Sequence, residues 1–169
     1  MSQFSSLFQL KKERIKPAEE RLFLGFATGD QAYAVGVDSV REILRIPKIF
    51  TLPKVPAFVK GVIDLRGTVM PVMDLKERLG LGTVDLKRGR VIVLVPGNQP
   101  LGVLVDSVVE VFRAPVKEIL PPPDMLDQSQ LAFIEGMVRV QEHLYLLLNA
   151  RSILTPKEFK TLETHTWSS

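Results

Sequence analysis

The residues with the clearest potential for chemistry are two acidic pairs, Asp38/Glu42 and Asp106/Glu110, each separated by four positions. Two neighbouring carboxylates can act as general acid and general base when burial raises the pKa of one of them. Both pairs fall in segments predicted to be strands, where side chains four residues apart need not converge. The favoured interpretation is solvated charges at strand ends, and the alternative is a catalytic pair that would require burial.

No other pattern typical of catalysis or of ligand binding occurs in the sequence. His143, in a predicted hairpin turn, and His165, near the end of the sequence, lack the spacing of a metal site. Cysteine is absent, as are the G-x-S-x-G, Walker and G-x-G-x-x-G motifs. We therefore expect no catalytic site, no metal and no cofactor. Turnover of a candidate substrate would identify an enzyme instead.

Short strands joined by tight turns must position these residues. Gly29-Asp30 and Arg66-Gly67 are typical hairpin turns, and the prolines that follow residue 46 indicate an extended loop. A capping residue followed by proline at Thr155-Pro156 predicts a C-terminal helix. The predicted strands are 21–28, 31–37, 39–46, 58–65, 69–74, 90–96, 99–105, 107–113, 134–140 and 143–148.

The chain repeats its own pattern. Residues 31–47 align with residues 99–115 at a constant offset of 68, and nine of the 17 positions are identical. Residues 61–74 resemble residues 136–149. Each segment begins with glycine, contains a turn followed by an apolar stretch, and ends with Asp or Asn. A repeat of this length corresponds to a small domain, so we predict two related modules with a cleft between them.

The predicted fold is mostly β: two small five-stranded antiparallel barrels packed around a shared hydrophobic seam, with short helices. The proposed boundaries are an N-terminal tail at 1–20, two β subdomains within 21–154 at about 21–80 and 90–154, and a C-terminal helix and tail at 155–169. Residues 81–89, which are polar and without a clear pattern, are interpreted as the linker.

Composition is that of an ordinary globular protein, with 46% hydrophobic and 24% charged residues. No apolar run approaches a membrane span or a signal peptide, and the lack of cysteine fits the cytoplasm. The net charge of +3 leaves a small nucleic-acid-binding barrel as an alternative, since Lys11, Lys12, Arg14, Lys87, Arg88 and Arg90 are basic. An aromatic content of 7% disfavours base stacking.

Several segments resemble the CheW-like chemotaxis coupling proteins. Residues 33–43 are similar to that family's Y-x-V-x-I-x-x-V-x-E-I stretch, and 101–108 to its second-half G-x-x-V-D-x-V run. Between them, Pro53, Pro56 and residues 61–75 resemble P-x-x-P-x-x-x-x-G-x-x-N-L-R-G-x-x-x-P-V-x-D-L, with Asp64 where the family more often has Asn. The resemblance covers residues 21–154, nearly the whole chain.

The resemblance implies SH3-like barrels and a non-catalytic adaptor. The implied partners are the cytoplasmic helical tip of a chemoreceptor, the regulatory domain of a chemotaxis-type histidine kinase, and other coupling proteins in a signalling array. It implies no nucleic acid and no membrane insertion, with membrane association only through receptor arrays. An alternative within the family is the coupling module of a pathway that does not serve chemotaxis.

Residues in the matching segments are candidates for partner binding. Val40 and Ile43 are either barrel core or the apolar lip of a groove for a receptor helix, and Arg66 is either an exposed turn residue or an interface anchor. Substitution of Val40 by Lys or of Arg66 by Glu is expected to weaken binding without unfolding. The full set is Val40, Glu42, Ile43, Gly61, Asp64, Leu65, Arg66, Val91, Val93, Val105 and Val108.

Overall fold

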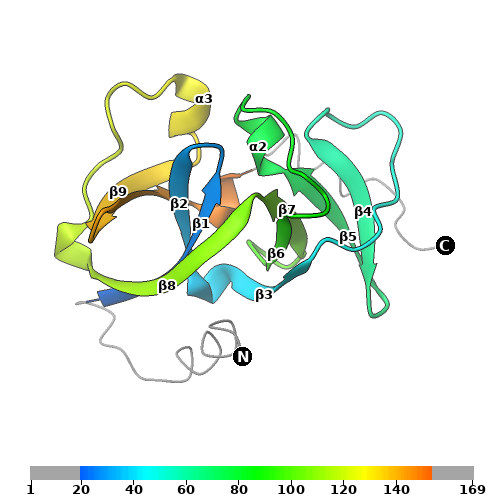
Figure 1. The fold of residues 1–169 in the computed structure, drawn as a ribbon, viewed down its shortest axis with the longest axis horizontal. Coiled ribbons are helices and arrows are strands. Elements are labelled where there is room, and N and C mark those ends of the chain that lie inside the picture. The colour runs from blue at the N-terminus through cyan, green and yellow to red at the C-terminus, as the bar shows by residue number, and fades with distance from the viewer. Residues whose placement is uncertain (1–19, 154–169) are drawn as a thin grey trace.

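The computed structural model describes residues 20–153, which form two five-stranded sheets (Figure 1). The strands are β1 (Glu20–Thr28), β2 (Gln31–Gly36), β3 (Val40–Arg45), β4 (Val59–Leu65), β5 (Thr68–Asp74), β6 (Arg90–Leu94), β7 (Leu101–Val105), β8 (Ser107–Pro115), β9 (Ile134–Val140) and β10 (His143–Leu148). Short helical turns join them: η1 (Val37–Ser39), α2 (Leu75–Arg78), η2 (Val116–Glu118), α3 (Gln128–Leu131) and η3 (Ala150–Ser152).

The mostly β prediction is confirmed by this architecture. Nearly all of the predicted N-terminal tail, and the whole of the predicted C-terminal helix at 155–169, lie outside the described residues. Between residues 20 and 153, no helix has the length and apolar character needed to cross a membrane.

The two sheets do not coincide with the two halves of the sequence. One sheet, here called barrel A, has the order β8-β1-β2-β10-β9, and the other, barrel B, has the order β3-β6-β7-β5-β4. The predicted subdomains at 21–80 and 90–154 are therefore wrong as spatial units, because barrel A combines β1 and β2 with three strands from the second half. If β1 to β5 are matched in order with β6 to β10, the two sheets have the same strand order.

The repeated segments are the two connections that cross between the barrels. Residues 31–47 begin in β2 of barrel A and enter barrel B through β3, whereas residues 99–115 begin in β7 of barrel B and enter barrel A through β8. Both crossings are short: η1 separates β2 from β3, and Asp106 alone separates β7 from β8. Connections this short hold the barrels side by side (Figure 1).

Each barrel contains one parallel strand pair, β2 with β10 in barrel A and β5 with β7 in barrel B. The wholly antiparallel pairing expected from the sequence is wrong at these two positions. The reason is that each of these pairs joins strands from different halves of the chain. In barrel A, β2 from the first half pairs with β10 from the second, and in barrel B, β7 from the second half pairs with β5 from the first. We call this arrangement the strand exchange. The remaining ladders are antiparallel, and the β3–β6 ladder contains a bulge between Val40 and Glu42.

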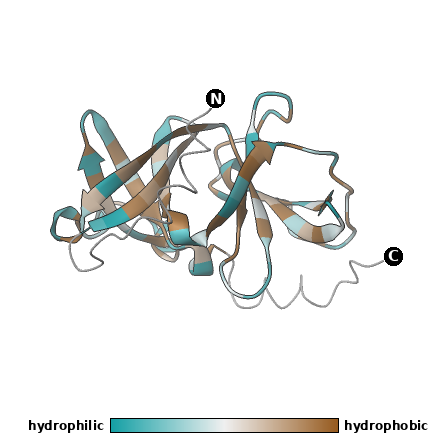
Figure 2. Cartoon of the chain, turned by 90° about the horizontal axis from the view of Figure 1, so that it is seen from below, coloured by the Kyte–Doolittle hydropathy of each residue, from teal (hydrophilic) through white to brown (hydrophobic). Residues whose placement is uncertain are grey.

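Three hydrophobic clusters form the core. The largest lies at the junction of the barrels and joins residues such as Leu24 and Val35 of barrel A with Ile92 and Val103 of barrel B. Smaller clusters fill barrel A, around Tyr145, and barrel B, around Ile63. Apolar and polar stretches alternate along the strands of both barrels (Figure 2), as expected for sheets with one buried face. The predicted shared seam is the junction cluster.

Candidate partner-binding surface

The turn between β4 and β5 fixes the direction of the Arg66 side chain. Arg66 has φ 53° and Gly67 has φ 89°, so both central residues adopt the left-handed conformation that two-residue hairpins favour. The Asp64 carboxylate accepts a hydrogen bond from the Gly67 backbone N–H at 2.9 Å. The side chain of Arg66 is 72% exposed. A stiff turn therefore presents a guanidinium to solvent, and Asp64 stabilises the turn.

The Arg66 guanidinium is held by Glu42 of β3. Arg66 Nη2 donates to Glu42 Oε2 at 2.6 Å. Since β3 and β4 lie at opposite edges of the same sheet, this side-chain contact links one edge of barrel B to the turn that follows the other edge. An exposed ion pair of this kind contributes only about 0–1 kcal/mol to stability. Its main effect is to orient a multidentate donor at the surface.

Half-buried apolar side chains lie close in the chain to this ion pair. Ile43 follows Glu42 and packs against the junction core, while Leu65 precedes Arg66 and packs against the barrel B core. Val108 of β8, on the other crossing strand, also packs against the junction core. These three predicted residues keep partial exposure. Together with Glu42, Asp64 and Arg66 they combine apolar area with charge, as protein interfaces do.

Four of the predicted residues do not reach the surface. Val40 is 2% exposed, and Val91, Val93 and Val105 are fully buried. Val40 and Val105 belong to the junction core, whereas Val91 and Val93 belong to the barrel B core. The structure places all four valines in the core, which was one of the two interpretations of Val40 from the sequence, and their side chains are enclosed by the protein itself. Each can affect binding only through packing.

Gly61 has a structural role in this protein. Its φ is 143°, and a Cβ atom there would lie 2.0 Å from the Phe50 carbonyl oxygen. Phe50 and Val62 exchange two backbone hydrogen bonds of 2.9 and 2.8 Å across this point. The pairing of β4 with β5 also shifts register between Val59 and Gly61. The glycine thus permits a bulge and a close approach of the chain to itself.

Two exposed apolar residues that were not singled out from the sequence occupy equivalent positions in the two barrels. Phe50 is 48% exposed and bridges to β4, and Leu120 is 51% exposed and bridges to β9 at Met137. Gly136 sits beneath Leu120 as Gly61 sits beneath Phe50, since a Cβ there would lie 2.7 Å from the Leu120 carbonyl oxygen. The paired glycines of the repeat were the available signal. Each barrel therefore presents one apolar side chain at the same relative position.

Three of the four acidic residues considered for catalysis are engaged in separate contacts, and the fourth, Asp38, is exposed. Glu42 pairs with Arg66, Glu110 accepts from the Tyr145 hydroxyl at 2.5 Å, and Asp106 lies 3.2 Å from the Lys76 ammonium. Burial, followed by the hydrogen bond and charge of Glu110, raises the pKa of Tyr145. Among residues 20–153, no group of three or more His, Asp or Glu side chains is placed to hold a metal ion.

Comparison with known proteins agrees with this geometry. The CheW-like domain family matches residues 22–158. Chemotaxis protein CheW of Rhizobium meliloti (strain 1021) is 31% identical over 139 residues, which cover 82% of this chain and 90% of that protein. Chemotaxis protein CheW of Helicobacter pylori is 30% identical over 161 residues, which cover 90% of this chain and 96% of that protein.

A solved structure has the same fold. The crystal structure of scaffolding protein TtCheW from Thermoanaerobacter tengcongensis aligns with a TM-score of 0.73 and 28% sequence identity, covering 82% of this chain and 94% of that one. The family match spans most of the chain and includes both barrels. The chain therefore belongs to the CheW-like family, and it is a non-catalytic adaptor of chemotaxis signalling.

Proposed function

We propose that this adaptor couples the cytoplasmic helical tip of a chemoreceptor to the regulatory domain of a chemotaxis-type histidine kinase. The observation that carries the proposal is the Glu42–Arg66 pair, held on a stiff turn beside half-buried apolar residues within a CheW-like fold. The protein acts in the cytoplasm and reaches the membrane only through the receptors. Its association with receptors and kinase forms part of a signalling array.

The receptor side of the coupling uses the surface around Arg66. A helical tip offers apolar side chains at i, i+3 and i+4, which match partly exposed residues such as Ile43 and Leu65. Glu42 and Arg66 supply one charge of each sign, and such a pair sets register and specificity more than affinity. Because Arg66 is already oriented by Glu42, little side-chain entropy is lost on binding.

The kinase side uses an end of a barrel. Phe50 and Leu120 are exposed apolar anchors at equivalent positions in the two barrels. A partner with a similar double-barrel fold can apply one of its barrel ends to one of these points in a head-to-tail contact. Such heterologous contacts close into rings or extend as open assemblies. Other coupling proteins fit the same positions.

Signal transfer through such an adaptor needs no covalent step. A receptor state that contacts the adaptor more favourably shifts the bound kinase toward one conformation by the difference in contact free energy. Each 1.4 kcal/mol of this difference corresponds to about a tenfold change in an equilibrium constant. The adaptor therefore has to hold receptor and kinase in a fixed relative geometry, and its two joined barrels are suited to that.

The test measures binding of the purified protein to a receptor-tip fragment and, separately, to the kinase regulatory domain. Arg66→Glu is expected to weaken receptor-tip binding by about tenfold or more while the protein remains folded. Arg139→Glu, on the exposed side of β9, is the matched control with the same charge change. Unchanged receptor affinity in a folded Arg66→Glu protein would remove this surface from the interface.

A further inference from the structure

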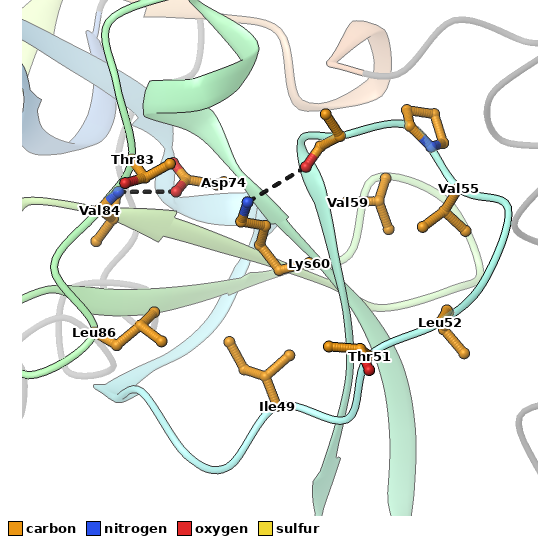
Figure 3. Close-up of a pocket in the computed structure, with 12 residues that line it drawn as sticks. Ile49, Thr51, Leu52, Val55, Val59, Lys60, Asp74, Thr83, Val84 and Leu86 are labelled. Atoms are coloured by element: carbon orange, nitrogen blue, oxygen red, sulfur yellow. Dashed lines mark hydrogen bonds between the residues drawn. The ribbon is translucent and has the colours of Figure 1, made fainter.

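A pocket of about 580 Å³ lies in barrel B (Figure 3). It opens between the β3–β4 loop and the loop that follows α2. The second loop contains residues 81–89, which were interpreted from the sequence as the linker between the two halves. Ile49 and Leu86 face each other across it in Figure 3, and Leu52 and Val55 extend the apolar wall. Lys60 on the wall is six residues before Arg66 along β4, a separation of roughly 20 Å in an extended strand.

The charged groups at the base of the pocket are already satisfied. Asp74 accepts hydrogen bonds from the backbone N–H of Val84 at 2.8 Å and of Glu77 at 3.1 Å. Lys60 forms an ion pair with Glu77 and also donates to the Ala57 carbonyl at 3.4 Å. Since these groups have partners within the protein, they contribute little to recognition. Apart from Thr51 and Thr83, the wall that remains for a ligand is aliphatic, so the inserted part of the ligand is mainly apolar.

The two loops that frame the pocket are strongly basic. Lys48 and Lys54 lie on the first loop, and Lys87 and Arg88 lie on the second. All four are exposed, and none forms an ion pair with another residue of 20–153. The one acid on these loops, Asp85, accepts hydrogen bonds from the backbone N–H of Lys87 and Arg88, and these bonds, together with the charges of both side chains, lower its pKa. One carboxylate against four cations leaves the loops with a positive surplus.

Positive charge continues onto the adjoining strands. Arg45, the last residue of β3, lies directly opposite Arg90, the first residue of β6. Like charges in such a cross-strand pair are destabilising. Arg90 donates only to the backbone carbonyls of Arg88 and Gly89 in the contacts between described residues. A surplus of charge that the protein does not neutralise is complementary to an anionic partner.

We propose that this pocket binds an acidic segment of a partner protein, in which an apolar side chain enters the pocket and flanking carboxylates contact the basic loops. The proposal assigns a pocket that lies next to Phe50 in the chain, since Ile49 and Thr51 line it. It goes beyond the proposed function by giving this part of barrel B a further ligand, an acidic segment. An acidic peptide is favoured over a nucleic acid because the wall is aliphatic, and stacking of bases requires aromatic rings. Carboxylates at the rim bring specificity and fast association, while the buried side chain brings affinity.

The probe is a fluorescein-labelled ten-residue peptide with two leucines four positions apart, flanked by four glutamates, and binding is followed by fluorescence anisotropy. Lys87→Glu/Arg88→Glu is expected to weaken binding by about tenfold or more, and so is replacement of both probe leucines by alanine. The matched control is Lys117→Glu/Arg139→Glu, which makes the same charge change at exposed sites of barrel A. Thermal unfolding confirms that both double variants fold.

A second variant tests the pocket itself. Leu86→Glu places a carboxylate on the exposed wall and is expected to weaken probe binding to a similar extent without unfolding the protein, since Leu86 is 55% exposed. The proposal is overturned if the probe does not bind, if the control double variant loses as much affinity as Lys87→Glu/Arg88→Glu, or if the alanine probe binds equally well. Tighter binding of a 20-nucleotide single-stranded DNA at the same residues also overturns it, in favour of a nucleic-acid site.

Discussion

The Asp106 carboxylate connects the two barrels. Its Oδ2 accepts a hydrogen bond from the Gly29 backbone N–H at 2.8 Å, in the hairpin turn of barrel A. The same oxygen lies 3.2 Å from the Lys76 ammonium on α2, which follows the last strand of barrel B. Because Asp106 occupies the crossing between β7 and β8, one side chain fixes the crossing, the turn and the helix relative to one another.

Asp106→Ala is expected to reduce the free energy of unfolding by about 1.5–3 kcal/mol, the usual contribution of a hydrogen bond to a charged group. Asp38→Ala is the matched control, since Asp38 is the repeat equivalent of Asp106 and its side chain is exposed. Urea denaturation of both variants measures the difference. An equal loss in the two variants would contradict the role assigned to Asp106.

Gly61→Ala is expected to destabilise the protein by about 3 kcal/mol or more, because the added Cβ would meet the Phe50 backbone and backbone cannot move aside cheaply. Gly97→Ala serves as the control, since a Cβ there meets nothing within 4 Å. Thermal denaturation compares the two. A Gly61→Ala protein as stable as the Gly97→Ala protein would show that the loop carrying Phe50 can shift away.

Val40→Lys is expected to unfold the protein, in contrast to the sequence-based expectation that it would only weaken binding. Val40 is 2% exposed in the junction core, and an unpaired ammonium there costs more than about 4 kcal/mol. Circular dichroism and denaturant titration measure the outcome. Arg41→Lys, at the neighbouring exposed position, is the control, and a stable, folded Val40→Lys protein would contradict the packing described.

Tyr145 makes the stability depend on pH in the alkaline range. Its pKa in the folded state is raised above the ordinary value of 10.0, mainly by burial. The folded protein therefore retains the phenol proton at pH values where the unfolded chain releases it. This contribution to stability is complete below the unfolded-state pKa and is lost as pH rises through the folded-state pKa.

Denaturant titrations at about pH 9 and about pH 11 test this dependence. Wild-type protein is expected to lose more stability between the two values than Tyr145→Phe, which has no phenol proton to release. Comparison with the variant cancels the contribution of lysines, which is common to both proteins. Identical losses in the two proteins would show that Tyr145 does not contribute in this way.

The sequence predicted the strands and the likeness of the two modules but not which strands share a sheet. Alternation and turn residues identify β2 and β3 as separate strands. The short segments at Asp38 and Asp106, however, could equally form a turn inside one barrel or a crossing from one barrel to the other. Pairing partners are set by tertiary packing, which no local pattern records. The strand exchange was therefore invisible to the sequence argument.

The candidate site was predicted in part for similar reasons. Glu42, Asp64 and Arg66 were found because a turn motif and a family signature mark them. The sequence left Val40 either in the core or at the surface, because a bulge at the start of β3 breaks the alternation that would have identified its buried face. The pocket was missed because its two loops, separated by a hairpin and a helix, meet only in the folded protein.

The exchange of strands makes each barrel depend on the opposite half of the polypeptide. Neither half contains a complete sheet, so a cut within residues 81–89 would yield two pieces that are each short of partners for their edge strands. The arrangement is that of a domain-swapped dimer whose two subunits have been tethered into one chain. Because the two crossings are so short, the barrels of such a scaffold cannot separate unless strands leave both sheets.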